Sequence, residues 1–296
     1  MSFLKQTAYY NNALDFNGGV LLKMNRIFVC GGDIRSVYMA QHLKDKGFEV
    51  SLFGHGENDD DFSDITRADT VILGLPAFKD KAVNMPCVDR RILVDDLIAG
   101  CKSCSLLAGG RFTPEELQKI TNAGIDCFDY SDDENFQIMN ALYTAEGTIA
   151  YLISNTSLSV IDMKILITGY GRISKALCNL LTSWPCRVSV YARKDADRSM
   201  CLCRGFNVLE SLAELSGFDV IINTVPADIF TEDALETIKT GGVIMDLSQR
   251  PGYVNKELCR KHGIKLMYLP GIPLTGAPQS AGIAAAKAVE CYTEGN

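Results

Sequence analysis

The stretch Ile165-Leu-Ile-Thr-Gly-Tyr-Gly-Arg-Ile-Ser174 decides how the chain is read. It is an apolar β-type run, followed by two spaced glycines and the start of a helical pattern. In dinucleotide-binding α/β domains the first glycine, here Gly169, permits the tight turn, and the second, Gly171, lets a pyrophosphate approach the backbone at the helix N-terminus. Ser174 stands where a third glycine is common, and a small side chain there still allows close helix–strand packing. The expected pyrophosphate turn comprises Gly169, Gly171, Arg172 and Ile173; a structural glycine turn without nucleotide is the alternative.

Strand and helix patterns alternate on both sides of this motif. In the second half we expect a helix over Arg172–Thr182 and strands at Lys164–Thr168, Arg187–Tyr191, Val220–Asn223, Val243–Asp246 and Lys265–Tyr268. In the first half we expect helices from Ile34 to Lys46 and from Pro114, capped by Thr113, to Gly124, and strands at Arg26–Cys30, Glu49–Phe53, Thr70–Leu73, Ser105–Ala108 and Ile125–Phe128. Such alternation indicates parallel sheets covered by helices.

The two halves also share a short sequence pattern. Asp69-Thr-Val-Ile-Leu-Gly-Leu-Pro76 and Asp219-Val-Ile-Ile-Asn-Thr-Val-Pro226 place an acid, a buried strand and a proline at the same offsets. An internal echo of this kind indicates a repeated supersecondary plan. The predicted fold class is therefore α/β, with two Rossmann-like parallel-sheet domains and an interdomain cleft.

Two long helical patterns are expected to join the halves, at Glu134–Ser154 and at Ala281–Thr293. The predicted organisation is an N-terminal arm (1–23), a substrate- or partner-binding domain (24–135), a linking helix (136–160) and an NADP-binding domain (161–280), with a C-terminal helix (281–296) crossing back to the first domain. Two crossings leave a cleft between the domains. The alternative is that both helices pack on the second domain.

Composition excludes several classes of protein. The chain has 296 residues, 47% of them hydrophobic and 22% charged, and a net charge of −7. This is ordinary for a globular protein, and no apolar run approaches the roughly 18 residues of a membrane span. An acidic chain lacks the basic face that nucleic acid requires. We expect no partner of either kind, neither membrane nor nucleic acid.

The cysteines do not form a metal-binding pattern. There are 11 cysteines but only three histidines, and the close pairs Cys101/Cys104 and Cys201/Cys203 lack the spacing of a zinc site. We therefore expect no metal and mostly buried, reduced thiols. No secretory signal is seen at the N-terminus, so the expected location is the cytoplasm.

The residues after the strand Arg187–Tyr191 bear on the choice of cofactor. NAD-binding proteins often place an acid there to hold the ribose 2′-hydroxyl, whereas a 2′-phosphate calls for cations. Here Arg193 and Lys194 come first, which favours NADP. Asp195 and Asp197 follow, and they favour NAD unless they only cap the next helix.

Other strand ends are expected to reach the same cleft, because ligands of parallel sheets bind at the carboxyl ends of the strands. The candidates are Thr224 and Pro226 beside the nicotinamide ribose, Asp246 after the next strand, and Pro270 with Gly271 after the last; each is alternatively part of a simple turn. The first half has Gly31-Gly32-Asp33 but lacks the second spaced glycine, so it is assigned to substrate or partner. Arg35 is expected to meet a carboxylate; a solvated surface arginine is the alternative.

Taken together, several segments resemble the A-subunit family of dipicolinate synthases. They are Gly31–Arg35, Asn140–Gly147, Gly169–Arg172, Asp246–Gly252, Pro270–Pro273 and Ala277–Gly282, and the resemblance runs from about Met24 to Cys291. The chain departs from the family pattern at Tyr143 (often Pro), Tyr253 (often Gly) and Gln279 (commonly basic).

The resemblance implies a function. It implies an NADP-linked, dehydrogenase-like protein that works with a flavoprotein-like partner, the B subunit of dipicolinate synthase. Together they convert 4-hydroxy-tetrahydrodipicolinate to dipicolinate in the mother cell of a spore-former. A homo-oligomer is left open. The substrate is a small dicarboxylate, so each carboxylate should meet a cation or a helix N-terminus, and Arg35 and Arg250 are the candidates.

The linking helix supplies the candidate catalytic residues. Asn140 and Thr144 are four apart and share a helix face, and Glu146 is the candidate general acid and base, with a pKa raised by the cleft. The alternative for Glu146 is an ordinary exposed glutamate. Two other functions stay open: a non-catalytic NADP-binding regulator of the B subunit, and a stand-alone amino- or hydroxy-acid dehydrogenase. The second of these is disfavoured by the lack of an evident His–Asp or Lys–Asp pair.

Cofactor choice can be tested at Arg193. We expect Arg193→Asp to weaken NADP binding more than NAD binding, because the new carboxylate repels the 2′-phosphate and accepts from a 2′-hydroxyl. Calorimetric titration with each nucleotide measures the two affinities. Equal losses for both nucleotides would contradict the assignment.

Overall fold

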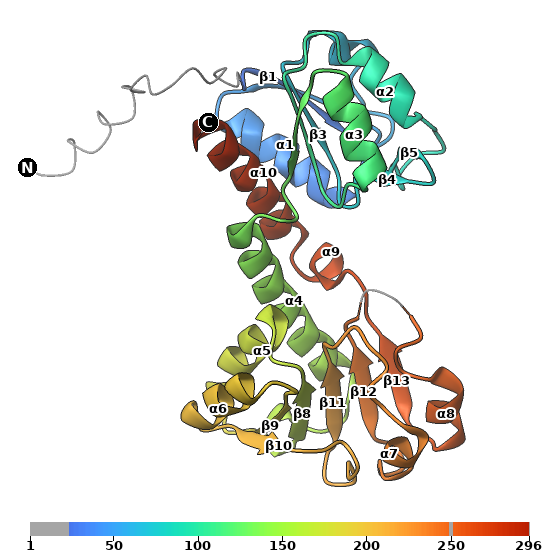
Figure 1. Ribbon diagram of the computed structural model, residues 1–296, viewed down its shortest axis with the longest axis vertical. Coiled ribbons are helices and arrows are strands. Elements are labelled where there is room, and N and C mark those ends of the chain that lie inside the picture. The colour runs from blue at the N-terminus through green and yellow to red at the C-terminus, as the bar shows by residue number, and fades with distance from the viewer. Residues whose placement is uncertain (1–23, 249–250, 296) are drawn as a thin grey trace, which may run out of the picture.

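The computed structural model describes residues 24–248 and 251–295, which form two parallel β-sheets with helices packed around them (Figure 1). The first sheet contains β1 (Arg26–Cys30), β2 (Glu49–Phe53), β3 (Thr70–Leu73), β6 (Leu106–Gly109) and β7 (Asp126–Asp129). Its order is β2-β1-β3-β6-β7, and every neighbouring pair is parallel.

The second sheet has six strands and repeats the plan. They are β8 (Lys164–Thr168), β9 (Arg187–Tyr191), β10 (Asn207–Leu209), β11 (Val220–Asn223), β12 (Val243–Asp246) and β13 (Lys265–Tyr268). The order is β10-β9-β8-β11-β12-β13, again with parallel pairing throughout. The predicted α/β fold class with two parallel sheets is confirmed.

Helices occupy the connections between strands, as parallel pairing requires. Those around the first sheet are α1 (Ile34–Asp45), η1 (Phe62–Arg67), α2 (Val94–Gly100) and α3 (Pro114–Asn122). Those around the second are η2 (Val160–Asp162), α5 (Arg172–Thr182), α6 (Asp195–Cys203), α7 (Glu232–Glu236) and α8 (Lys256–Lys261). The expected cap of α3 is present as a capping box, in which Thr113 and Glu116 satisfy each other's backbone N–H groups.

Several short elements have no counterpart in the sequence-based prediction. These are α2, α7, α8, β10 and the small hairpin of β4 (Phe78–Lys79) and β5 (Ala82–Val83). Each has seven residues or fewer. Such elements span at most about two helical turns, which is too short for hydrophobic periodicity to show.

The chain passes between the two sheets through α4 (Glu134–Asn155) and returns through α9 (Ile272–Gly276) and α10 (Pro278–Gly295) (Figure 1). Close contacts at two glycines hold these helices. A Cβ on Gly147 of α4 would collide with Ile272 of α9, and one on Gly282 of α10 would collide with the Arg35 carbonyl of α1. The helix expected near the C-terminus therefore lies against α1 and the first sheet, and α4 packs on α5 of the second.

The part of the chain that the structure describes has no helix long and apolar enough to cross a membrane. The N-terminal arm expected at residues 1–23 lies outside the described residues.

Candidate functional site

A cavity of about 440 Å³ lies where the carboxyl ends of the two sheets approach each other. Its walls come from loops after β3, β6 and β7, from one face of α4, and from the glycine turn and the end of β11 in the second sheet. The lining residues are Leu75, Arg111, Ser131, Asp132, Phe136, Gln137, Asn140, Ala141, Gly171, Arg172, Ile173 and Thr224. Both halves of the chain thus contribute to one cavity.

The glycine turn forms the second-sheet side of this cavity. Gly169 has a φ of +87°, and a Cβ there would lie 2.9 Å from Thr224 Oγ1, so the turn itself demands glycine. Gly171 differs, because it has an ordinary φ and a Cβ on it would meet nothing within 4 Å. It caps the N-terminus of α5, whose first N–H groups have no partners within the helix. The open space beside these N–H groups fits a pyrophosphate, which needs close approach to the backbone.

Hydroxyl groups hold the turn in place. Thr224 Oγ1 donates to the carbonyl of Thr168 over 2.8 Å, and it lies 2.8 Å from Ser174 Oγ. Thr224 lines the cavity as expected, and its hydroxyl also ties β8, α5 and the end of β11 together. Ser174, at the third position of the motif, is fully buried and provides this link as well as a small side chain.

A buried polar chain joins the carboxyl ends of the central strands. Thr168 Oγ1 donates to Asn223 Oδ1 (2.6 Å), and Asn223 Nδ2 donates to Asp246 Oδ1 (2.9 Å), which also accepts from the Ser248 N–H (3.1 Å). Asp246 is only 2% exposed and does not line the cavity. Its carboxylate, expected near the cofactor, instead positions strand ends, and Asn223 was missed because an amide at a strand end gives no motif.

The cations proposed for a 2′-phosphate stand directly after β9. Arg193 and Lys194 are both exposed, and neither side chain has a hydrogen bond or ion pair with another described residue. Asp195 pairs with Arg198, whose guanidinium also donates to the Ala192 carbonyl. The carboxylate of Asp195 is therefore paired within α6 and does not neutralise Arg193 or Lys194.

Arg35, expected to bind a substrate carboxylate, is already engaged. Its Nε and Nη2 donate to the two oxygens of Asp33 (2.8 and 2.7 Å), and Nη2 also donates to the Leu75 carbonyl (3.0 Å). Burial opposes both charges, but the hydrogen bonds and charge of the pair prevail, so the pKa of Asp33 is lowered and that of Arg35 is raised. Arg35 does not line the cavity, and its guanidinium is held by Asp33, the cap of α1, so its expected contact with a substrate carboxylate stays a prediction.

Two arginines, Arg111 and Arg172, line the cavity, and Arg111 is the one whose guanidinium has no ion pair with a described residue. It follows β6 with a φ of +61°, an uncommon conformation for a residue with a side chain. Its backbone N–H donates to Asp129 Oδ1 and Ser131 Oγ (3.1 and 3.2 Å), which fixes the loop. Its guanidinium has no hydrogen bond to any described residue. Desolvation by its surroundings and the nearby Arg35 charge lower the pKa of Arg111. A bound carboxylate would oppose this shift, because an opposite charge stabilises the guanidinium.

The residues of α4 separate onto two faces. Asn140 lines the cavity, and Thr144, which is buried, donates to the Asn140 carbonyl (2.7 Å), so these two share a face. Glu146 lies two residues beyond Thr144, about 200° around the helix. It is exposed and does not line the cavity. The expectation that the cleft desolvates Glu146 is therefore wrong.

The remaining expected residues differ in their positions relative to the cavity. Arg172 lines the cavity and pairs with Glu134 of α4 over 2.6 Å, linking α5 to the interdomain helix. Pro226, Pro270 and Gly271 are exposed and outside the cavity lining, and Gly271 begins α9 with a φ of +68°. Arg250 lies outside the described residues.

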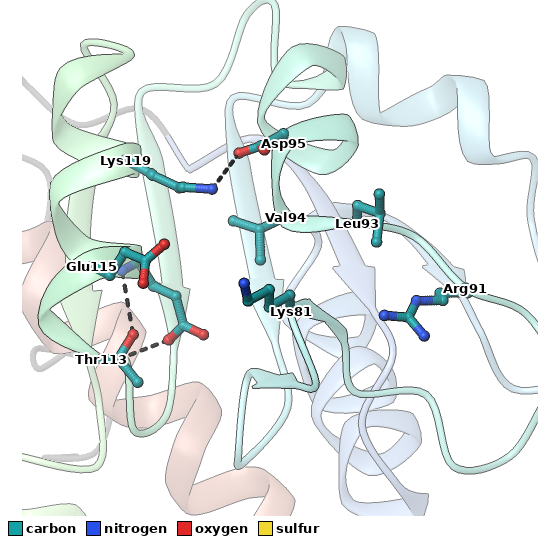
Figure 2. A pocket seen from close by; sticks show the side chains of 9 residues that line it. Lys81, Arg91, Leu93, Val94, Asp95, Thr113, Glu115 and Lys119 are labelled. Atoms are coloured by element: carbon teal, nitrogen blue, oxygen red, sulfur yellow. Dashed lines mark hydrogen bonds and ion pairs between the residues drawn. The ribbon is translucent and has the colours of Figure 1, made fainter.

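A second hollow lies between α2 and α3 of the first sheet, and Figure 2 shows the side chains around it. Lys119 pairs there with Asp95 (2.9 Å), and the N-terminus of α3 is capped by Thr113 and Glu116. These charges and donors satisfy one another. The hollow contains no residue of the glycine turn, so the cavity at the sheet ends is the better candidate for a cofactor-dependent site.

Comparison with known proteins shows what the chain is similar to. Residues 26–131 match the model of the N-terminal domain of the dipicolinate synthase A subunit. The A subunit of dipicolinate synthase from Bacillus subtilis (strain 168) is 25% identical over 274 residues, which cover 87% of this chain and 92% of that protein. Over most of its length the chain is therefore similar to a dipicolinate synthase A subunit, and residues 26–131 match the N-terminal domain of that family.

Solved structures share the fold of this chain. The crystal structure of the dipicolinate synthase A subunit from Bacillus halodurans superposes with a TM-score of 0.80 at 22% identity, covering 93% of this chain and 99% of that one. The NAD⁺-bound 3-phosphoglycerate dehydrogenase of Entamoeba histolytica gives a TM-score of 0.55 at 14% identity, covering 93% and 97%. The fold of the chain thus resembles that of this NAD⁺-binding dehydrogenase.

The contrast between the two glycines yields a prediction. Gly171→Val should abolish nucleotide binding while the chain stays folded, because the new side chain enters open space that a pyrophosphate would occupy. Calorimetric titration with NADP and a thermal melt measure the two effects. Gly169→Val is the matched control and should instead destabilise the protein, since it combines a positive φ with a clash against Thr224. Unchanged nucleotide affinity in Gly171→Val would show that the turn is only structural.

Proposed function

We propose that the chain is the nucleotide-binding, catalytic A subunit of a dipicolinate synthase, which oxidises and dehydrates 4-hydroxy-tetrahydrodipicolinate to dipicolinate with NADP. The observation that carries the proposal is the cavity that joins a glycine turn with open space at Gly171 to a guanidinium, Arg111, without a hydrogen-bond partner among the described residues. A dinucleotide site beside a carboxylate-binding cation is what oxidation of a small dicarboxylate requires.

The reaction divides into two losses. The ring hydroxyl leaves as water, and the ring then loses one hydride and one proton to become aromatic. When bound, NADP supplies the hydride acceptor. Because formation of the aromatic ring makes the overall reaction favourable in free energy, the protein mainly has to position the ring and transfer protons.

Individual residues take separate parts in this proposal. Gly171 and the first N–H groups of α5 hold the pyrophosphate, and Arg193 with Lys194 holds the 2′-phosphate, which makes NADP the preferred cofactor over NAD. Arg111 binds one carboxylate of the substrate through a charge-assisted fork. Asn140 and the exposed Asp132 also line the cavity, and Asp132 is the one carboxylate among the described residues that do so.

The family name also carries expectations about partners. We propose that the chain works with the B subunit of dipicolinate synthase, in the cytoplasm of the mother cell of a spore-former. If the B subunit supplies part of the chemistry, the purified chain alone should bind NADP but form dipicolinate only when the B subunit is added. Nucleotide binding without turnover, even in the presence of that partner, would instead support a regulatory NADP-binding role.

The assay for the function also tests Arg111. With NADP and 4-hydroxy-tetrahydrodipicolinate, the protein with its partner should produce reduced nicotinamide and dipicolinate in equal amounts, both followed by absorbance. Arg111→Gln should lower kcat/KM on the order of 10–100-fold, because a hydrogen bond to a charged group contributes about 1.5–3 kcal/mol. Arg91→Gln, in the other hollow, is the control and should behave as the wild type. An Arg111→Gln enzyme with unchanged kcat/KM would remove Arg111 from the substrate site.

Proton transfer is tested by two carboxylates in the same assay. Asp132→Asn should lower turnover by a factor on the order of 10²–10⁴, the usual share of general acid–base catalysis, because Asp132 lines the cavity. Glu146→Gln should stay within about threefold of the wild type, well short of that range, because its side chain is exposed and outside the cavity. The reverse result would return the proton-transfer role to Glu146.

A further inference from the structure

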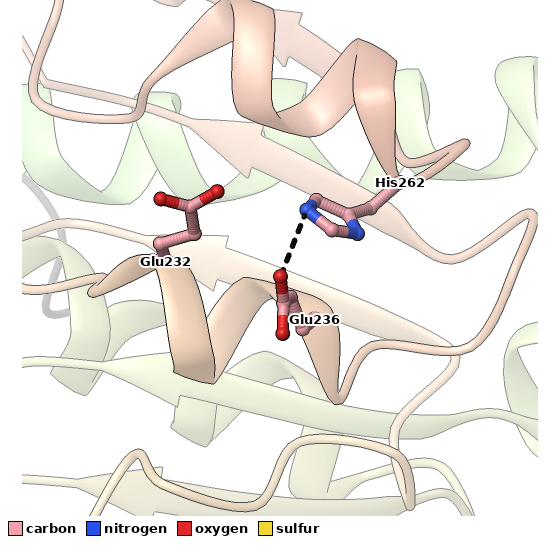
Figure 3. A group of neighbouring side chains, drawn as sticks. All are labelled: Glu232, Glu236 and His262. Carbon is pink, nitrogen blue, oxygen red and sulfur yellow. Dashed lines mark ion pairs between the residues drawn. The ribbon is translucent and has the colours of Figure 1, made fainter.

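Three potential metal ligands from two helices meet on the second sheet, away from the cavity. Glu232 and Glu236 stand four residues apart on α7, and His262 follows the last residue of α8. Figure 3 shows the two carboxylates and the imidazole ring converging on one point. One donor atom from each residue lies within 4.8 Å of the other two.

The imidazole has an unused nitrogen at this point. His262 Nε2 is buried and has no hydrogen-bond partner within the described ranges. Its closest carboxylate oxygen, Glu236 Oε1, is 3.7 Å away, which is too far for a hydrogen bond. A buried ring nitrogen without a partner costs free energy, and a metal ion between the ring and the carboxylates would supply the missing interaction.

The charge of the cluster also suits a cation. Lys261 Nζ lies 2.8 Å from Glu232 Oε1, so one ammonium already occupies part of the place that a divalent cation would take. A metal ion would displace the flexible, exposed Lys261 side chain and neutralise both carboxylates.

We propose that Glu232, Glu236 and His262 form a binding site for a divalent transition metal ion of the zinc type. One imidazole nitrogen and two carboxylate oxygens are donors that Zn²⁺ and Co²⁺ accept, and a water molecule would complete a tetrahedral site. Metal–donor distances near 2.0 Å place neighbouring donors about 3.3 Å apart. The two glutamates are exposed, so rotation of their side chains can bring the donor atoms to this shorter separation from the present distances of up to 4.8 Å.

The site would act on stability, independently of the proposed catalytic function. His262 lies three residues before β13, and so at the amino edge of the sheet, whereas the cavity lies at the carboxyl edge. The buried faces of α7 and α8 meet in one hydrophobic cluster, through residues such as Leu235 and Cys259. A metal bound between the two helices would add a cross-link on the outer side of this cluster.

Cobalt is the probe that separates this site from the cysteines. We expect the full-length protein, first treated with EDTA, to bind one Co²⁺ per chain with weak visible absorption bands and a raised melting temperature. Excess Zn²⁺ should remove the visible bands by displacing the cobalt. Strong near-ultraviolet absorption from cobalt–thiolate bonds, or the lack of any saturable cobalt signal, would overturn the proposal.

Variants locate the bound ion. Glu236→Gln should weaken Co²⁺ by at least about tenfold, a loss that even removal of a group outside the metal's own ligands can cause. His262→Asn should do the same, and because Glu236 is exposed its variant stays informative if His262→Asn folds poorly. The control is His42→Asn, since His42 faces Glu290 at 3.5 Å in a two-residue pair with an equally unpartnered Nε2. Cobalt affinity that is unchanged in Glu236→Gln, or lowered equally by His42→Asn, would contradict the site.

Discussion

Parallel pairing of the strands is the constraint on which the rest of the molecule depends. In a parallel sheet the carboxyl ends of all strands lie at the same edge, so residues far apart in sequence are brought together there. Each sheet of this protein is parallel throughout. Leu75, Arg111 and Ser131 follow three strands of the first sheet, Gly171 and Thr224 follow two strands of the second, and all five line one cavity.

Two kinds of contact keep these edges in position. Within the second sheet, hydrogen bonds from Thr168 through Asn223 to Asp246 tie three neighbouring strand ends together beneath the glycine turn. Between the sheets, close helix packing at Gly147 and Gly282 leaves no room for a side chain. The hydrogen bonds explain why the carboxylate of Asp246 is buried near the cavity without lining it. The helix packing fixes the helices that connect the wall containing Arg111 to the wall containing the glycine turn.

The sequence predicted most strands because they are apolar runs bounded by glycine, proline or charged residues, and five strands of the second sheet have the predicted bounds. Gly169 and Gly171 stand out in the sequence because a tight turn needs the first glycine and open space beside the backbone needs the second, which leaves a recognisable spacing. Arg111 was missed because its importance depends on which strand ends meet, and an arginine after a strand has no motif of its own.

A sequence does not reveal which side chains pair with one another or which face of a helix points toward a cavity. The expectations for Arg35 and Glu146 depended on these two features. Arg35 looked available for a substrate carboxylate until the structure paired it with Asp33, two residues earlier. Glu146 lies on the correct helix, but α4 turns the face carrying Asn140 toward the cavity and leaves Glu146 exposed. Periodicity indicates which residues share a face, but tertiary packing decides where that face points.

The central claim is that one cavity between the sheets binds both the nucleotide and the dicarboxylate. A crystal structure of the protein with NADP and pyridine-2,6-dicarboxylate tests this most directly. We expect the pyrophosphate to lie against the N–H groups that follow Gly171 and one carboxylate to lie within hydrogen-bond distance of Arg111. The pyridine ring should lie beside the nicotinamide. A dicarboxylate bound in the hollow between α2 and α3, or a nucleotide away from the glycine turn, would contradict this claim.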